Sequence, residues 1–159
     1  MRVTVTAEDA ARGEMTLPEI CAEVAPVPGV GDSPKLAFQH SDGSRGAIQN
    51  YRDKYTVVHF WASWCEACKK QLPALRHLQE RYTARGLATL GLSLDQDAAE
   101  WQAMLKRIDL PWSQGRLAVS ADAGVSSVPA YWLLDPTGKI VAKTYDVDEL
   151  AKALAERMK

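Results

Sequence analysis

From about residue 35 onward, the spacing of apolar side chains alternates between that of a strand and that of a helix. Residues 55–62 are almost continuously apolar, which is typical of a central strand covered on both faces. Residues 64–85 carry apolar side chains at three- and four-residue spacing, which predicts an amphipathic helix that stops at Gly86. Residues 87–94 alternate again, so we expect a parallel, right-handed strand–helix–strand unit.

Two hairpins are predicted around this unit. Residues 36–51 alternate, turn at Ser-Asp-Gly-Ser and end in one short helical turn, which indicates an N-terminal hairpin. Residues 130–134 and 139–144 flank Asp-Pro-Thr-Gly, a sequence typical of a type I turn, and predict an antiparallel hairpin. Residues 113–127, just before that hairpin, are mostly small and polar and predict a loop.

Two further helices are predicted from their first turns. Asp97 and Asp146 each precede an apolar stripe of helical period. Each is followed three residues later by a glutamate, Glu100 or Glu149, which is the pattern of a capping box. The chain is therefore expected to be an α/β protein, with a central mixed β-sheet flanked by helices and an N-terminal β-hairpin extension.

The first 30 residues do not fit this pattern. Prolines and glycines interrupt them repeatedly, as in an extended linker. We expect residues 1–30 to be an N-terminal extension or the remnant of an upstream region, followed by one domain over residues 31–159. Cys21 lies in this extension, and both a free thiol and a third redox partner are open interpretations.

Composition excludes several classes of protein. The net charge is −1 with no basic cluster, so nucleic acid is not an expected partner. Three cysteines are too few for a disulfide framework. No run approaches the roughly 18 apolar residues of a membrane span. The first residues lack the apolar region of a secretory signal, so either the protein is cytosolic or its export signal or upstream region lies outside this sequence.

The candidate chemistry lies where the central strand meets the first helix. Cys65 and Cys68 form a Cys-x-x-Cys pair, which zinc sites, haem attachment and redox pairs all use. The strand-to-helix setting favours a redox pair. Cys65, at the helix start, is the expected nucleophile because unpaired N–H groups and the helix dipole stabilise a thiolate there. Cys68, one turn further on the apolar face, is the expected resolving thiol.

Several motifs around the pair resemble those of thioredoxin-fold proteins. The matching residues are Phe60-Trp61-Ala62-x-Trp64-Cys65-x-x-Cys68, Pro73 five residues after the second cysteine, and Val128-Pro129 just before the antiparallel hairpin. Three further segments resemble the TlpA/ResA branch of thiol:disulfide oxidoreductases. They are Asp42-Gly43, Cys65-Glu66-Ala67-Cys68-Lys69-Lys70 and Asp135-Pro136-x-Gly138-Lys139. The resemblance covers roughly residues 31–159. It implies a thioredoxin-like fold and an extracytoplasmic location in the bacterial periplasm or cell envelope, with any membrane tether outside this chain.

The residues around the dithiol also have expected roles. It implies that Pro129 is a cis-proline facing the pair, where the backbone beside Val128 could accept a substrate segment in extended form. Trp64 and Ala67 are expected to form an apolar rim. Glu66 adjoins the nucleophile, and its charge should repel the thiolate and make the couple more reducing. Alternatively, Glu66 is simply a favourable acid in the first helical turn.

Two residues depart from the family pattern where carboxylates are proposed to manage the proton of the buried cysteine. His59 stands where thioredoxins carry a buried aspartate, and Gln71 stands where the branch often has a glutamate. Both are candidate proton-relay residues. Alternatively, His59 is a core histidine bonded to backbone or water. Val128 replaces the usual threonine before Pro129.

The function predicted from these residues is thiol–disulfide exchange between the Cys65–Cys68 pair and protein disulfides, in the reducing direction. The expected partners are protein thiols and disulfides and an upstream dithiol donor. No metal and no cofactor besides the redox-active disulfide are expected, and we predict a monomer. The alternative is a non-catalytic or metal-handling domain of a larger envelope protein. A peroxidase would need a Pro-x-x-x-Thr/Ser-x-x-Cys motif, which is absent.

Overall fold

The computed structural model describes residues 27–117, 123–125 and 127–158, so Cys21 lies outside the described residues. These residues form one seven-stranded mixed sheet with strand order β2-β1-β5-β4-β3-β6-β7. The strands are β1 (Ala37–His40), β2 (Arg45–Ala47), β3 (Thr56–Trp61), β4 (Ala88–Ser93), β5 (Ser113–Arg116), β6 (Ala130–Leu134) and β7 (Ile140–Thr144). The helices are α3 (Glu66–Tyr82), α4 (Ala98–Ile108) and α5 (Val147–Arg157), with short 3₁₀ turns η1 (Ile48–Tyr51) and η2 (Thr83–Arg85).

The central strand β3 is buried along its whole length, as its apolar sequence predicts. It pairs in parallel with β4 and antiparallel with β6. Alternate side chains of β3 enter different parts of the core. Val58 and Phe60 pack on one face with residues of the N-terminal hairpin, while Val57 packs on the other face with α3 and α5. The prediction of a strand–helix–strand unit with parallel strands is confirmed.

One predicted loop is wrong in part. Ser113–Arg116 is strand β5, which pairs in parallel with β4 and antiparallel with β1. Its sequence, Ser-Gln-Gly-Arg, has no apolar alternation, and a Cβ at Gly115 would collide with the ring of Phe38. The strand therefore exists because β4 and β1 both offer it backbone partners, and it joins the N-terminal hairpin to the main sheet.

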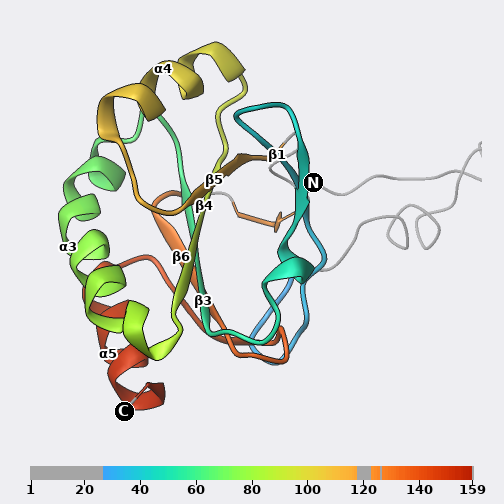
Figure 1. Cartoon of the computed structure of the whole chain (residues 1–159), viewed down its shortest axis with the longest axis vertical. Coiled ribbons are helices and arrows are strands. Elements are labelled where there is room, and N and C mark those ends of the chain that lie inside the picture. Colours follow the sequence, from blue (N-terminus) through green and yellow to red (C-terminus); the bar gives the residue numbers. More distant parts are fainter. Residues whose placement is uncertain (1–26, 118–122, 126, 159) are drawn as a thin grey trace, which may run out of the picture.

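Helices α3 and α5 cover one face of the sheet, and α4 lies near the end at which α3 begins (Figure 1). Helix α3 runs through Pro73 and gives way to η2, which ends at Gly86 in the left-handed conformation. Leu72, Leu75 and Leu150 are among the apolar side chains buried beneath these helices. The other face is covered by η1 and by the segment that precedes β1.

The prediction of two capping boxes is only half correct. Asp97 and Asp146 do cap α4 and α5, accepting the backbone N–H of the residue two positions on at 2.9 and 2.6 Å. Among the described residues, neither following glutamate bonds back to its cap. Glu149 pairs with Lys152 at 3.3 Å instead, because an exposed lysine one turn along is a competing partner.

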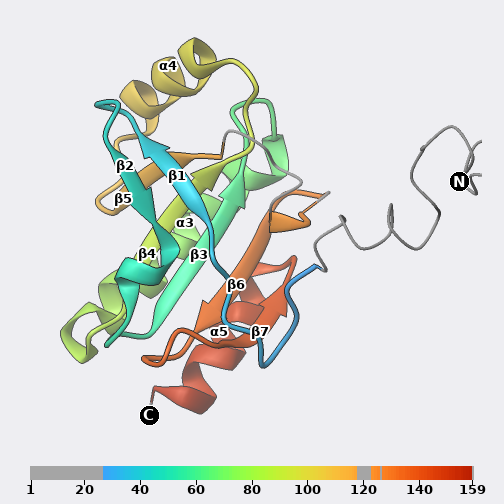
Figure 2. The same cartoon turned by 90° about the vertical axis from the view of Figure 1, so that its right-hand side faces the viewer.

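The segment from residue 28 to residue 32, which spans the predicted boundary between the N-terminal extension and the domain, lies against the edge strand β7 (Figure 2). Gly31 N–H donates to the Ile140 carbonyl at 2.8 Å, and Ile140 N–H donates to the Asp32 carbonyl at 2.9 Å. The Lys143 ammonium also donates to the Pro28 carbonyl at 2.7 Å. These bonds partly cover a sheet edge that would otherwise be open to pairing with another chain.

Candidate active site

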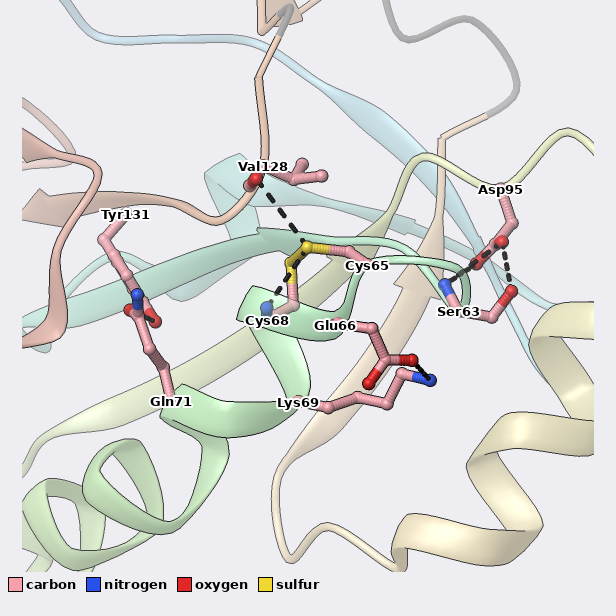
Figure 3. Close-up of a disulfide and its surroundings, with 9 residues drawn as sticks. All are labelled: Ser63, Cys65, Glu66, Cys68, Lys69, Gln71, Asp95, Val128 and Tyr131. Carbon is pink, nitrogen blue, oxygen red and sulfur yellow. Dashed lines mark hydrogen bonds and ion pairs between the residues drawn. A yellow bond between two sulfur atoms is a disulfide. The ribbon is translucent and has the colours of Figure 1, made fainter.

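The two cysteines lie where β3 leads into α3. Cys65 is the N-cap of α3 and forms a disulfide with Cys68, with their Cα atoms 5.3 Å apart (Figure 3). The Cys68 N–H donates to the Cys65 sulfur at 3.1 Å. Cys65 is 6% exposed and Cys68 is fully buried, so the expected order of accessibility is found.

The position of Cys65 suits a thiolate. The first N–H groups of a helix have no partner within the helix, and the dipole places partial positive charge there. A reduced Cys65 sulfur at this position can keep the Cys68 N–H as a hydrogen-bond donor. Both effects favour the charged form of the sulfur, which is the form that attacks disulfides.

The segment before β6 faces this sulfur. The Val128–Pro129 peptide bond is cis, as expected from the resemblance. The Val128 carbonyl oxygen lies 3.7 Å from Cys65 Sγ (Figure 3). Val128 is half-buried and Pro129 is buried, so main-chain atoms of Val128 are the part of this segment presented to the dithiol.

Trp64 and Ala67 are both exposed, as an apolar rim requires. Trp64 is 67% exposed, which is unusual for so large an apolar side chain. Both residues directly adjoin a cysteine in the chain. Their contact with a substrate stays a prediction.

The Glu66 carboxylate pairs with the Lys69 ammonium at 2.8 Å (Figure 3). This hydrogen bond, with the charge of Lys69, lowers the pKa of Glu66, so the carboxylate is ionised at neutral pH. Its side chain is 76% exposed. Because Lys69 offsets part of its charge and solvent screens the rest, Glu66 repels a Cys65 thiolate only weakly.

His59 is fully buried beneath the site. Its ring stacks against Tyr131 with centroids 5.0 Å apart and against Trp61 at 6.4 Å. Desolvation lowers the pKa of His59 to about 3, so the imidazole is neutral at physiological pH. Neither ring nitrogen has a hydrogen-bond partner within the described part of the chain. Both interpretations of His59, a proton relay and a core histidine, stay predictions.

Gln71 is occupied by structural hydrogen bonds. Its Oε1 accepts the Tyr131 hydroxyl at 2.7 Å and the Val147 N–H at 3.2 Å, which joins α3 to β6 and to the start of α5. Burial raises the pKa of Tyr131, so this hydroxyl remains a donor. A relay role for Gln71 would require its carbonyl to leave these two partners, so the relay stays a prediction.

Sequence analysis missed Asp95 and Ser63. Asp95 is 2% exposed and follows β4, while Ser63 lies two residues before Cys65. The Asp95 carboxylate accepts the Ser63 N–H and the Ser63 hydroxyl (Figure 3). One signal was available: parallel strands end at the same edge of a sheet, so a polar residue just after β4 is brought close to the residues just after β3.

Within the described ranges, no group of three or more histidine, cysteine, aspartate or glutamate side chains is arranged to hold a metal ion. The helices in those same ranges are all too short or too polar to cross a membrane.

Comparison with known proteins agrees with this geometry. The model of the AhpC/TSA family matches residues 31–157. The thiol-disulfide oxidoreductase ResA of Bacillus cereus is 24% identical over 120 residues, covering 70% of this chain and 66% of ResA. The thioredoxin-like protein YneN of Bacillus subtilis is 27% identical over 113 residues, covering 68% of this chain and 66% of YneN. The chain thus matches just under two thirds of the length of these relatives.

Solved structures share the fold. A thiol-disulfide oxidoreductase from Bacteroides fragilis superposes with a TM-score of 0.69 at 28% identity, covering 78% of this chain and 97% of that one. A putative thiol:disulfide interchange protein DsbE from Chlorobium tepidum reaches a TM-score of 0.75 at 20% identity, covering 83% and 99%. The family match spans most of the chain and includes the dithiol, the cis-proline and the sheet that positions them. The protein is therefore a member of the AhpC/TSA family with a thioredoxin-like fold of the TlpA/ResA type.

Proposed function

We propose that the protein is a thiol:disulfide oxidoreductase in which Cys65 attacks and Cys68 resolves. One observation carries the assignment. Cys65 Sγ caps α3 by accepting the Cys68 N–H in its first turn, and Cys65 is 6% exposed whereas Cys68 is fully buried. A nucleophile must be ionised and reachable, and the helix cap and the greater exposure both support Cys65 over Cys68 in this role.

In the reducing direction, the Cys65 thiolate attacks one sulfur of a substrate disulfide. The substrate S–S bond breaks, and its other sulfur leaves as a thiolate that takes up a proton. Cys68, after losing its proton, then attacks Cys65 Sγ and releases the second substrate thiol. Two electrons have passed to the substrate, and the Cys65–Cys68 disulfide must be reduced again by a dithiol donor.

The substrate class we propose is a disulfide-bonded protein segment in extended form. Val128 presents main-chain atoms next to Cys65 Sγ, and main-chain pairing suits an extended segment of any sequence. Trp64 and Ala67 would contact the apolar side chains of that segment. Similarity to ResA supports an extracytoplasmic site of action, with electrons supplied by an upstream dithiol.

The reducing direction rests on Glu66, and its pairing with Lys69 weakens that support. Equilibration of the dithiol with glutathione tests the direction. A reduction potential close to that of thioredoxin, about −270 mV, agrees with a reductase, and one near −120 mV indicates an oxidant.

Trapping tests the roles of the two cysteines. Cys68→Ser should accumulate a mixed disulfide between Cys65 and a disulfide-bonded substrate protein, because no thiol remains to resolve it. Cys65→Ser should accumulate none. Equal trapping by the two variants would contradict the assignment, and no trapping by either would contradict the proposed activity.

A further inference from the structure

The turn that leads to Cys65 leaves one backbone donor without a partner of its own. Cys65 N–H donates to the Ala62 carbonyl at 3.1 Å, which closes a turn over residues 62–65. Ser63 is the second residue of that turn, and a turn of this kind has no acceptor for the N–H at its second position. Ser63 is only 9% exposed, so the donor has to be satisfied from elsewhere in the protein.

Asp95 supplies the acceptor. Its two carboxylate oxygens lie 3.0 and 3.2 Å from the Ser63 nitrogen, and one of them accepts the Ser63 hydroxyl at 2.6 Å. The other also accepts the Ser93 hydroxyl. Asp95 is the one buried carboxyl group among the residues that the structure describes. All the hydrogen bonds at its carboxylate are received, which suits an ionised group.

Asp95 is itself fixed by two strands. Its N–H donates to the Ser93 hydroxyl at 2.9 Å, and its backbone carbonyl accepts the Arg116 guanidinium of β5 at 3.3 Å. The parallel pairing of Trp61 with Ser93 sets the ends of β3 and β4 side by side. The turn before the nucleophile is therefore tied to the ends of β4 and β5 through one residue, Asp95.

We propose that Asp95 is a positioning residue for the nucleophile, holding the residue 62–65 turn so that the Cys65 sulfur stays at the N-terminus of α3. The proposal rests on the proposed function only in naming Cys65 as the nucleophile. The physical reason is that the anchored residue lies close to Cys65 in the chain. With Ser63 anchored, only Trp64 lies between a fixed backbone position and the capping sulfur, so the donor Cys68 N–H and the sulfur remain aligned.

The charge of Asp95 has the opposite effect on Cys65. A nearby negative charge disfavours a thiolate and raises its pKa, whereas a correctly held cap lowers it. Asp95→Asn and Asp95→Ala both remove the charge, but they differ in hydrogen bonding. Asparagine keeps a carbonyl oxygen for Ser63 and an amide that can donate to the Ser93 hydroxyl. Alanine keeps neither, so comparison of the two variants isolates positioning from charge.

The experiment measures the pKa of Cys65 in each reduced variant by thiolate absorbance and by alkylation rate against pH. The pKa in Asp95→Ala should be higher than in Asp95→Asn by about one unit. Disulfide exchange by Asp95→Ala should be about tenfold slower than by Asp95→Asn. Amide hydrogen exchange at Ser63 should be fast in Asp95→Ala and slow in Asp95→Asn, because only asparagine retains an acceptor.

Equal Cys65 pKa values in the two variants would overturn the proposal, since charge alone would then account for any effect. Asp97→Asn is the matched control, because it removes an exposed carboxylate two residues away that does not contact Ser63. If Asp95→Ala does not fold, Ser63→Ala replaces it. That variant loses only the hydroxyl bond, and a raised Cys65 pKa supports the proposal while an unchanged one overturns it. The titration needs no substrate, so it stands even if the wild-type protein exchanges no disulfides.

Discussion

The three long helices begin in two different ways. Helices α4 and α5 are capped by exposed carboxylates, those of Asp97 and Asp146. Helix α3 is capped by the sulfur of Cys65, although the donors at its start are the same kind of backbone N–H. The caps accept their N–H donors at 2.9 and 2.6 Å in α4 and α5 and at 3.1 Å in α3.

This difference shows how the fold favours a reactive sulfur. A carboxylate is among the best caps because it is a charged acceptor at the positive end of the helix dipole. A neutral sulfur is a poorer acceptor, so α3 depends more on the tertiary bonds around its start. Ionisation of the reduced Cys65 makes the α3 cap resemble those of α4 and α5. The free energy that stabilises a carboxylate cap then lowers the pKa of the thiol.

The largest expected effect comes from Cys65→Ser. A hydroxyl caps a helix well but does not exchange with disulfides, so the two roles of the side chain separate. Exchange should fall by about 10³-fold or more. The free energy of unfolding should stay within about 1 kcal/mol of the reduced wild type. Insulin reduction and urea unfolding measure the two quantities, and residual exchange at the wild-type rate would remove Cys65 from the mechanism.

Acid should destabilise the folded protein through His59, which is fully buried in strand β3. The pKa of His59 is about 3 in the folded protein, against its ordinary 6.5, so the unfolded chain binds one more proton between these values. The free energy of unfolding should therefore fall as the pH is lowered from about 6.5 towards 3, by about 1.4 kcal/mol per pH unit. His59→Asn should lose this slope in urea unfolding at several pH values.

His77 is the matched control for that prediction, because it lies outside the core on helix α3. His77→Asn should keep the wild-type slope. A slope that survives in His59→Asn would mean that the acid sensitivity belongs to other groups.

The carboxylate caps should matter for stability alone. Asp97→Ala and Asp146→Ala each leave a backbone donor without its partner and should lower the free energy of unfolding by about 1 kcal/mol. Each carboxylate bonds to a backbone N–H of its own helix start, so the rate of disulfide exchange should not change. Chemical unfolding and an exchange assay check both statements. A slower exchange rate in either variant would contradict the distinction between carboxylate caps, which stabilise the fold alone, and the Cys65 cap, which takes part in exchange.

The smallest expected effect concerns Glu66. Glu66→Gln removes a charge close to the Cys65 sulfur, so the pKa of Cys65 should fall by a few tenths of a unit. The effect is small because Lys69 already pairs with the carboxylate in solvent. Glu80→Gln, further along the exposed side of α3, is the control and should leave the Cys65 pKa unchanged. An equal shift in both variants would assign the effect to net charge.

The features that could be predicted from sequence are those that depend on the spacing of residues close together in the chain. The α3 stripe repeats over several turns, and Gly86 supplies the left-handed residue that ends η2, the 3₁₀ turn that follows α3. The dithiol could be placed because it lies at the joint between a buried strand and this helix. Pro129 needed the family resemblance in addition, since a lone proline before a strand does not specify its isomer.

The features that could not be predicted depend on contacts between distant segments. Strand β5 has four residues and no apolar alternation, so only the backbone groups of β4 and β1 identify it as a strand. Asp95 and Ser63 are 32 residues apart, and the β3–β4 register brings them together. The role of the Asp95 carboxylate, which bonds to the turn before Cys65, could not be predicted from the local sequence. That sequence identifies Asp97 as the helix cap and assigns no role to Asp95.

The central claim is that Cys65 is an ionisable cap and Cys68 a buried thiol, and titration of the reduced protein tests it most directly. Cys68→Ser and Cys65→Ser isolate the two thiols, and thiolate absorbance against pH gives each pKa. We predict a pKa for Cys65 well below the ordinary value of about 8.5 and one for Cys68 above it. Two thiols that both titrate near 8.5, or a lower pKa at Cys68, would contradict the account.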